Sequence, residues 1–209
     1  MQIARTALRL AWLLLVAPLL LGGSIAQAEG DLNARLKGEY AFTQIHFCVS
    51  TRVSGQHFGP GFSVPSGGAT TSTRSNEGIL TFDGQGTGSF DGKTLTINHS
   101  ATGSGALPVS EAEFTCPLTY AVNADGTFTT HLACSARGLS GAGAGTPSTV
   151  TGLELHGQLQ DGGRLFIAND TRPNVETVTS TSSDGVTSEF ERICGRSQTA
   201  IKVRHAGAE

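Results

Sequence analysis

The stretch AEFTCPLTYAVNADGTFTTHLAC, residues 112–134, predicts a β-hairpin and indicates the fold class. Its first half places an apolar side chain at every second position, which is typical of a strand with one buried face. These positions are Phe114, Cys116, Leu118, Tyr120 and Val122. The following residues, 123–127, fit a three-residue hairpin loop that requires one left-handed residue, and Gly126 stands at that position.

The same loop fixes the register of the two strands. It sets Leu118 opposite Leu132, and it sets Cys116 opposite Cys134, where two cysteines are close enough for a cross-strand disulfide. Pro117 has no N–H to donate to the ladder, so we expect the pairing to end or bulge at that residue.

Three other glycine-containing loops, at 84–86, 161–163 and 183–185, predict hairpins of the same kind. The opposite pairs that they imply are Leu80 with Phe90, Leu159 with Leu165, Val178 with Phe190, and Glu176 with Arg192. A phosphate-binding loop would open a helix, and a calcium repeat would recur at a fixed interval; neither pattern occurs here. The dipeptide Asp91-Gly92 is either a second turn or a bulge.

The alternating segments predict an all-β fold of eight to ten strands. The strands lie near residues 39–49, 77–83, 87–99, 112–122, 127–135, 150–160, 163–169, 174–181, 187–194 and 199–203. Sequential hairpins of this number close into an antiparallel up-and-down barrel, which leaves no exposed sheet edge; a two-sheet β-sandwich is the alternative. A short N-terminal helix, capped by Asp31 and ended by Gly38, precedes the barrel.

Two segments predict loops because they are rich in small and turn-forming residues. Residues 51–75 contain many Gly, Pro and Ser and are too long for a hairpin turn, so we expect a long functional loop there. Residues 138–147 predict a flexible connection.

The first 28 residues predict a secretory signal peptide. Arg5 and Arg9 precede an apolar run, and a small-residue cleavage pattern ends at Ala28. The apolar run is shorter than the ~20 residues that a membrane-spanning helix needs. We therefore expect residues 29–209 to form a single exported domain, periplasmic or secreted, with no membrane partner in its mature form.

All four cysteines lie in the predicted mature domain, and an even number in an oxidising compartment predicts two disulfides. Joining Cys116 to Cys134 leaves Cys48 to pair with Cys194. A closed barrel could bring the first long strand beside one of the last, but the cysteines alone allow three connectivities. A zinc site is the alternative, although the cysteines lack Cys-x-x-Cys spacing.

The charge balance excludes some classes of partner. The chain has 14 Lys and Arg against 17 Asp and Glu, and two of the basic residues belong to the predicted signal peptide. An acidic domain lacks the basic face that nucleic acids and anionic membranes require, so we expect no nucleic-acid partner.

The order of elements resembles a known group of folds. A short helix, the segment LKGEYAF (36–42), sequential hairpins and a late arginine resemble the lipocalin and avidin-like barrels, and also small exported barrel proteins of bacteria. In lipocalins a Gly-x-Trp motif on the first strand packs against an arginine near the end of the barrel. Gly38-x-Tyr40 and Arg192 or Arg196 stand in those places here, with Tyr replacing Trp. The resemblance implies a barrel architecture.

The first predicted strand carries the candidate ligand site. Tyr40, Phe42, Gln44 and His46 share one face, and if that face points inward, Gln44 and His46 supply polar groups in an apolar cavity. Tyr120 could add its hydroxyl to the same site. The alternative is that these are hydrogen-bonded core residues or lie at the rim of the barrel. No motif indicates a cofactor or a metal, and we expect neither.

Three functions from different classes follow. The first is a carrier or sensor of a small apolar ligand. The second is a protein-binding module or inhibitor that uses Phe58 and Phe62 of the 51–75 loop as apolar anchors. The third is a small-barrel enzyme similar to allene oxide cyclases or dirigent proteins, although no nucleophile elbow or other catalytic motif occurs.

Overall fold

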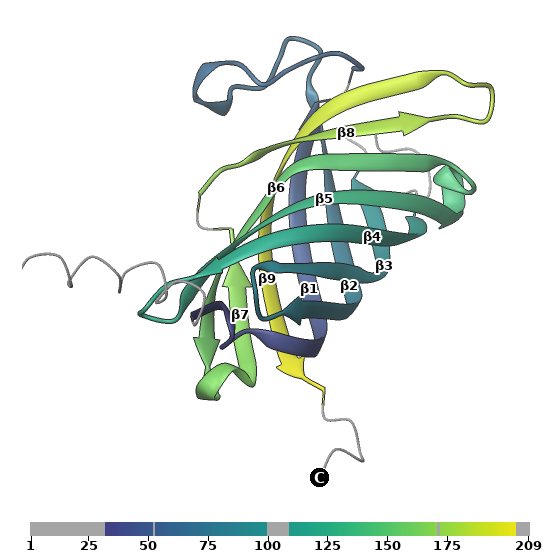
Figure 1. Ribbon diagram of the computed structural model, residues 1–209. Helices are drawn as coiled ribbons and strands as arrows, with labels where there is room; N and C mark the ends of the chain where they lie inside the picture. The colour runs from purple at the N-terminus through teal and green to yellow at the C-terminus, as the bar shows by residue number, and fades with distance from the viewer. Residues whose placement is uncertain (1–31, 52, 100–108, 171, 204–209) are drawn as a thin grey trace, which may run out of the picture.

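A computed structural model describes residues 32–51, 53–99, 109–170 and 172–203, and within them the chain forms nine antiparallel strands (Figure 1). The strands are β1 (Lys37–Thr51), β2 (Ala69–Asp83), β3 (Thr87–His99), β4 (Val109–Val122), β5 (Thr127–Ser140), β6 (Pro147–Gln160), β7 (Leu165–Asn169), β8 (Val175–Thr181) and β9 (Thr187–Lys202). The predicted signal peptide (1–28) and the predicted cap Asp31 lie outside the described residues.

The strands form one closed sheet, which confirms the predicted barrel and not the sandwich. Each strand from β1 to β6 pairs with the next, and β9 pairs with β1 to close the ring. β7 and β8 run in the same direction between β6 and β9. β7 pairs with the C-terminal ends of β6 and β9, and β8 pairs with their N-terminal ends. The short strands β7 and β8 therefore together occupy the position of a single strand in an up-and-down barrel.

The turn chemistry predicts three of the four hairpin registers correctly. Leu80 lies opposite Phe90, Val122 opposite Phe128, and Glu176 opposite Arg192. The Asn123 N–H donates to the Thr127 carbonyl at 2.7 Å, and Gly126 has φ 82°, as the three-residue loop requires. At Pro117 the β4–β5 ladder is interrupted and then continues in the same register.

The predicted register of the β6–β7 hairpin is wrong by one residue. Leu159 lies opposite Phe166 and not Leu165, because the loop contains four residues, 161–164. Asp161 and the next two glycines all have positive φ, and Arg164 closes the turn with an ion pair to Asp161 at 2.6 Å. Phe166, rather than Leu165, is therefore the residue buried in the core.

Several predicted boundaries also change. β2 begins at Ala69, so the long loop spans 52–68 and not 51–75. β5 and β6 shorten the predicted 138–147 loop to 141–146, and β9 joins two predicted strands into one. Ladder hydrogen bonds satisfy the backbone of these Thr- and Ser-rich segments, which accounts for the longer strands.

At the predicted N-terminal helix, residues 32–33 are helical and residues 34–36 form a turn, and Gly38 belongs to β1. Asp91-Gly92 is neither a turn nor a bulge, because β3 continues through it with Gly92 opposite Gly78. A Cβ at Gly78 would lie 2.0 Å from the Asp91 carbonyl oxygen, so these two strands approach closely only because both residues are glycines. Among the described residues no helix is both long and apolar enough to cross a membrane.

The barrel interior is apolar at the end where β7 lies, as its buried aromatic residues show. This is the lower end in Figure 1. Aromatic rings pack edge to face there, with centroid distances of 5.6 Å for Tyr40–Phe82, 5.0 Å for Phe82–Tyr120 and 5.1 Å for Phe128–Phe166. This aromatic cluster fills the lower end of the barrel, and polar side chains accumulate above it.

Two disulfides join neighbouring strands, as predicted. Cys48–Cys194 links β1 to β9 where the barrel closes, and Cys116–Cys134 links β4 to β5. The described chain contains no free cysteine.

Candidate ligand site in the barrel interior

The predicted face of β1 points into the barrel. Tyr40, Phe42, Gln44 and His46 are all buried, with Gln44 1% and His46 5% exposed. The opposite face of β1 is turned outward, where Ile45 and Phe47 are more than half exposed. Side chains alternate between the two faces of a strand, so residues two positions apart point in the same direction. All four of these residues therefore point inward.

The two tyrosines close the lower end of the barrel. The Tyr40 hydroxyl donates to the Gly163 carbonyl at 2.6 Å, and the Tyr120 hydroxyl donates to the Leu36 carbonyl at 2.9 Å. Burial, with a smaller contribution from Tyr120, raises the pKa of Tyr40 to about 12. Both hydroxyls are therefore neutral groups that join loops to strands, and neither lines the cavity described next.

A cavity of about 70 Å³ lies above the aromatic cluster. One wall is polar and consists of Gln44, His46, Arg74, Asn76, Thr94 and Arg192. The other wall is apolar and consists of Phe90, Phe114, Ala136, Val150, Leu153 and the Cys116–Cys134 disulfide. Phe42 lies outside the cavity, with its ring 4.4 Å from that of Phe90. Of the residues predicted to bind a ligand, only Gln44 and His46 line it.

Strand register builds the polar wall. Gln44 lies between Gln198 on β9 and Asn76 on β2, and Asn76 faces Thr94 on β3. One step higher, His46 lies between Arg196 and Arg74. These two rows cross four adjacent strands, so the sheet itself holds the polar side chains together.

Gln44 is the centre of the hydrogen bonds in this wall. Its Nε2 donates to Gln198 Oε1 at 3.0 Å, and its Oε1 accepts from Asn76 Nδ2 at 3.2 Å. His46 Nε2 lies 2.6 Å from the same Gln44 oxygen, so Nε2 carries the proton and donates it. His46 Nδ1 is then a free acceptor.

His46 is neutral in the folded protein. Burial, together with Arg196, Arg192 and Arg74, lowers its pKa well below 6.5. The unfolded chain therefore takes up a proton on His46 before the folded chain does. This difference destabilises the fold as the pH falls below 6.5 and has no effect above that value.

We expect the His46→Gln variant to lose this pH dependence. Between pH 6.5 and the lower folded-state pKa, His46 contributes a slope of up to about 1.4 kcal/mol per pH unit to the free energy of unfolding. Urea titrations at several pH values measure the slope. His131→Gln, which removes an exposed histidine, is the matched control. An equal slope in wild type and His46→Gln below pH 6.5 would contradict this account.

Four buried polar atoms in the cavity wall have no hydrogen-bond partner among the described residues. They are His46 Nδ1, Asn76 Oδ1, Arg74 Nε and Thr94 Oγ1. Buried polar groups in folded proteins almost always have a partner, and those that lack one indicate a functional role or a bound molecule. His46 and Asn76 are both more than nine-tenths buried.

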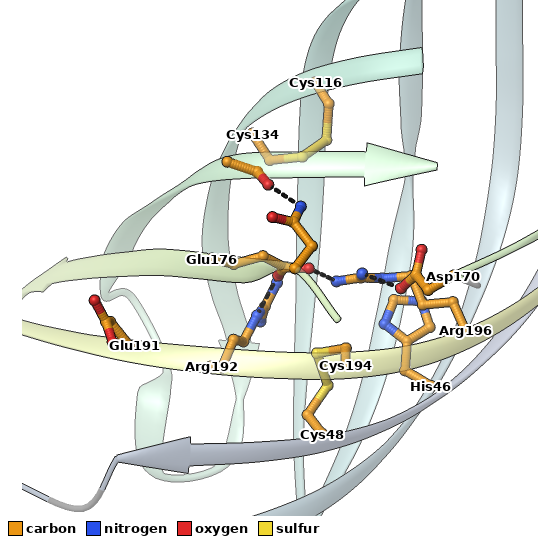
Figure 2. Close-up of polar contacts among 12 residues, drawn as sticks. His46, Cys48, Cys116, Cys134, Asp170, Glu176, Glu191, Arg192, Cys194 and Arg196 are labelled. Atoms are coloured by element: carbon orange, nitrogen blue, oxygen red, sulfur yellow. Dashed lines mark hydrogen bonds and ion pairs between the residues drawn. A yellow bond between two sulfur atoms is a disulfide. The ribbon is translucent and has the colours of Figure 1, made fainter. Parts of the chain in front are cut away.

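A network of buried charges lies beside the cavity. Figure 2 shows the Glu176 carboxylate between Arg192, at 2.6 Å, and Arg196. Arg196 also pairs with Asp170 at 2.6 Å. Burial would raise the pKa of Glu176, but the two arginines outweigh it and hold that pKa below its usual value. Glu176 is therefore ionised at neutral pH.

Arg74 is a different case, because no carboxylate pairs with it among the described residues. Burial, with Arg192 and Arg196 as like-charged neighbours, lowers its pKa, and Glu176 opposes this effect. The interior thus contains three arginines and the two carboxylates Glu176 and Asp170, so among the described residues one arginine, Arg74, has no carboxylate partner.

One cluster resembles a metal site in composition only. Ligand atoms of His46, Cys48 and Cys194 lie within 4.8 Å of one another. The two sulfur atoms are bonded to each other in a disulfide, so neither is the thiolate that binds a metal.

The 52–68 loop is attached to β9 through Glu191. This carboxylate accepts from the Phe58 N–H at 2.7 Å and contacts His57 Nδ1 at 2.8 Å. Of the two predicted anchors, Phe58 is half-buried, whereas Phe62 is 46% exposed and has φ 61°, an unusual conformation for an aromatic residue.

Sequence reasoning missed Arg74, Asn76 and Thr94. The predicted 51–75 loop includes Arg74, although Ser72, Arg74 and Asn76 continue the alternation of the inward residues Leu80 and Phe82. That spacing is the signal that could have found them. Glu176 and Arg192 were predicted to lie opposite one another, but not to be buried.

The Gly38-x-Tyr40 motif has a lysine beside it. The Lys202 Nζ atom lies 5.8 Å from the centroid of the Tyr40 ring. Arg192 and Arg196 lie higher in the barrel, in the network with Glu176.

The fold and site define a closed antiparallel barrel with an apolar lower end and a charged cavity above it. Searches against family models, curated proteins and solved structures found no match to this chain.

Proposed function

We propose that this chain is an exported carrier or sensor that binds a small ligand inside the barrel. The observation that carries the proposal is the cavity, where four unpartnered buried polar atoms face an apolar wall. Small-ligand sites combine an apolar lining with a few polar groups that orient the ligand. The aromatic cluster closes the lower end, so a ligand enters from the upper end.

Export and the lipocalin-like resemblance belong to the same proposal. The predicted signal peptide and the two disulfides both fit an oxidising compartment, where disulfides persist. Lipocalins and related barrels also bind small molecules inside a closed sheet, which is consistent with a ligand in this cavity.

The ligand must be small. A cavity of about 70 Å³ is well below the ~300–1,000 Å³ of sites for drug-sized molecules. A molecule with a short apolar chain of about four carbons is the appropriate probe.

Filling the cavity should abolish binding. We expect 1-butanol to shift the backbone amide NMR signals of the cavity strands, and Ala136→Leu to remove those shifts because the added carbons occupy the apolar wall. Ala121→Leu makes the same change at an exposed position of β4 and should leave binding unchanged. Equal butanol shifts in Ala136→Leu and wild type would place the ligand elsewhere, and a wild type without shifts would count against the proposal.

A second candidate function is protein binding by the 52–68 loop. The supporting observation is the exposure of Phe62 and Val64 on a segment that Glu191 attaches to the barrel. A double variant, Phe58→Ser with Phe62→Ser, that loses a partner but still binds butanol would favour this function. Retention of the partner would exclude these anchors.

A further inference from the structure

Arg74 distinguishes this cavity from a purely apolar pocket. Arg192 and Arg196 pair with Glu176 and Asp170, but Arg74 pairs with no carboxylate among the described residues, and its buried Nε has no acceptor. An arginine in a low-dielectric interior binds an anion strongly, because both the charge and the planar N–H groups match a carboxylate.

The neighbouring free atoms restrict where an anion can bind. Thr94 Oγ1 is a second unpartnered donor in the same cavity. His46 Nδ1 and Asn76 Oδ1 are both acceptors, because His46 Nε2 and Asn76 Nδ2 donate to Gln44, and acceptors repel a carboxylate. The donors Arg74 and Thr94 are therefore the groups that attract an anion.

The number of charges and the volume restrict its chemical class. One unmatched positive charge favours a singly charged anion over a phosphate monoester, which carries almost two negative charges. The opposite wall, with Phe90, Phe114, Val150 and Leu153, requires an apolar group on the same molecule. Arg74 is only partly buried as a residue, whereas its Nε atom is fully buried.

We propose that the ligand is a small organic monocarboxylate, with its carboxylate paired to Arg74 and bonded to the Thr94 hydroxyl, and with its apolar chain on the Phe90–Phe114 wall. This inference rests on the proposed function and specifies its ligand class. Each added methylene is expected to strengthen binding by up to about fourfold until the chain fills the cavity.

The test compares butyrate with 1-butanol, which has the same number of carbons and no charge, at pH 7 by NMR titration. Wild type should bind butyrate at least about tenfold more tightly than 1-butanol, because a hydrogen bond to a charged group adds that much to the affinity. Arg74→Gln should remove the preference and leave butanol binding intact. Arg137→Gln makes the same charge change at an exposed position of β5 and should keep the preference.

The outcomes separate this inference from the proposed function. Equal affinities for butyrate and butanol in wild type would contradict the proposal that the ligand is a carboxylate, but would leave the proposed small-ligand function intact. A preference that survives in Arg74→Gln overturns the role of Arg74. Binding of neither probe overturns both. If Arg74→Gln does not fold, Arg74→Lys tests the role of Arg74 instead. A lysine keeps the positive charge, so the preference for butyrate must then persist in weaker form.

Discussion

Replacing Glu176 with glutamine should lower the free energy of unfolding by about 3–5 kcal/mol, the cost of leaving buried charges without their partner. Glu176 is completely buried and pairs with both Arg192 and Arg196. The neutral amide cannot balance two guanidinium groups in a low-dielectric interior. Urea unfolding of the two proteins at pH 7 measures the difference.

Glu154→Gln is the matched control, because Glu154 is more than one-third exposed and its ion pairs within the described chain are with His131 and His156. Exposed pairs contribute about 0–1 kcal/mol, so this control should change stability little. A loss below about 1 kcal/mol for Glu176→Gln would mean that water reaches the network, and that the interior is not the low-dielectric environment described here.

Removing the Cys48–Cys194 disulfide should have a comparable effect. The two residues are 146 positions apart, and the chain-entropy treatment gives about 5 kcal/mol for a closed loop of this length. The double variant Cys48→Ala, Cys194→Ala should therefore unfold at a much lower urea concentration than wild type.

The second disulfide provides an internal comparison. Cys116 and Cys134 are 18 positions apart, which corresponds to about 3 kcal/mol by the same relation. Cys116→Ala, Cys134→Ala should thus be less destabilising than the first double variant. The reverse order would show that strain or residual structure in the unfolded chain dominates over loop length.

Much of the fold could be predicted from the sequence because its signals are local. Alternating apolar residues and glycine turns fixed the β4–β5 register and placed Cys116 opposite Cys134. The β6–β7 register could not be fixed in this way, because Leu165 and Phe166 are both apolar and either register gives an apolar face. Only the four-residue loop, with positive φ at a non-glycine residue, selects Phe166.

The candidate site was less predictable for a physical reason. The inward residues of the first half of β2, Ser72, Arg74 and Asn76, are all polar, so hydrophobic periodicity is absent where the barrel interior becomes polar. The sequence pattern of this segment therefore predicts a loop. Gln44 and His46 are candidates because they share a face of the first strand with Tyr40 and Phe42. The other face carries Ile45 and Phe47, so only the structure decides which face points inward.

The central claim is that the upper interior of this barrel holds a small ligand. Native mass spectrometry of the protein, expressed with export to an oxidising compartment and purified gently, tests this claim most directly. The account predicts a reproducible extra mass that disappears on denaturation and is absent from Ala136→Leu. A bare protein mass that 1-butanol and butyrate both fail to change would contradict it.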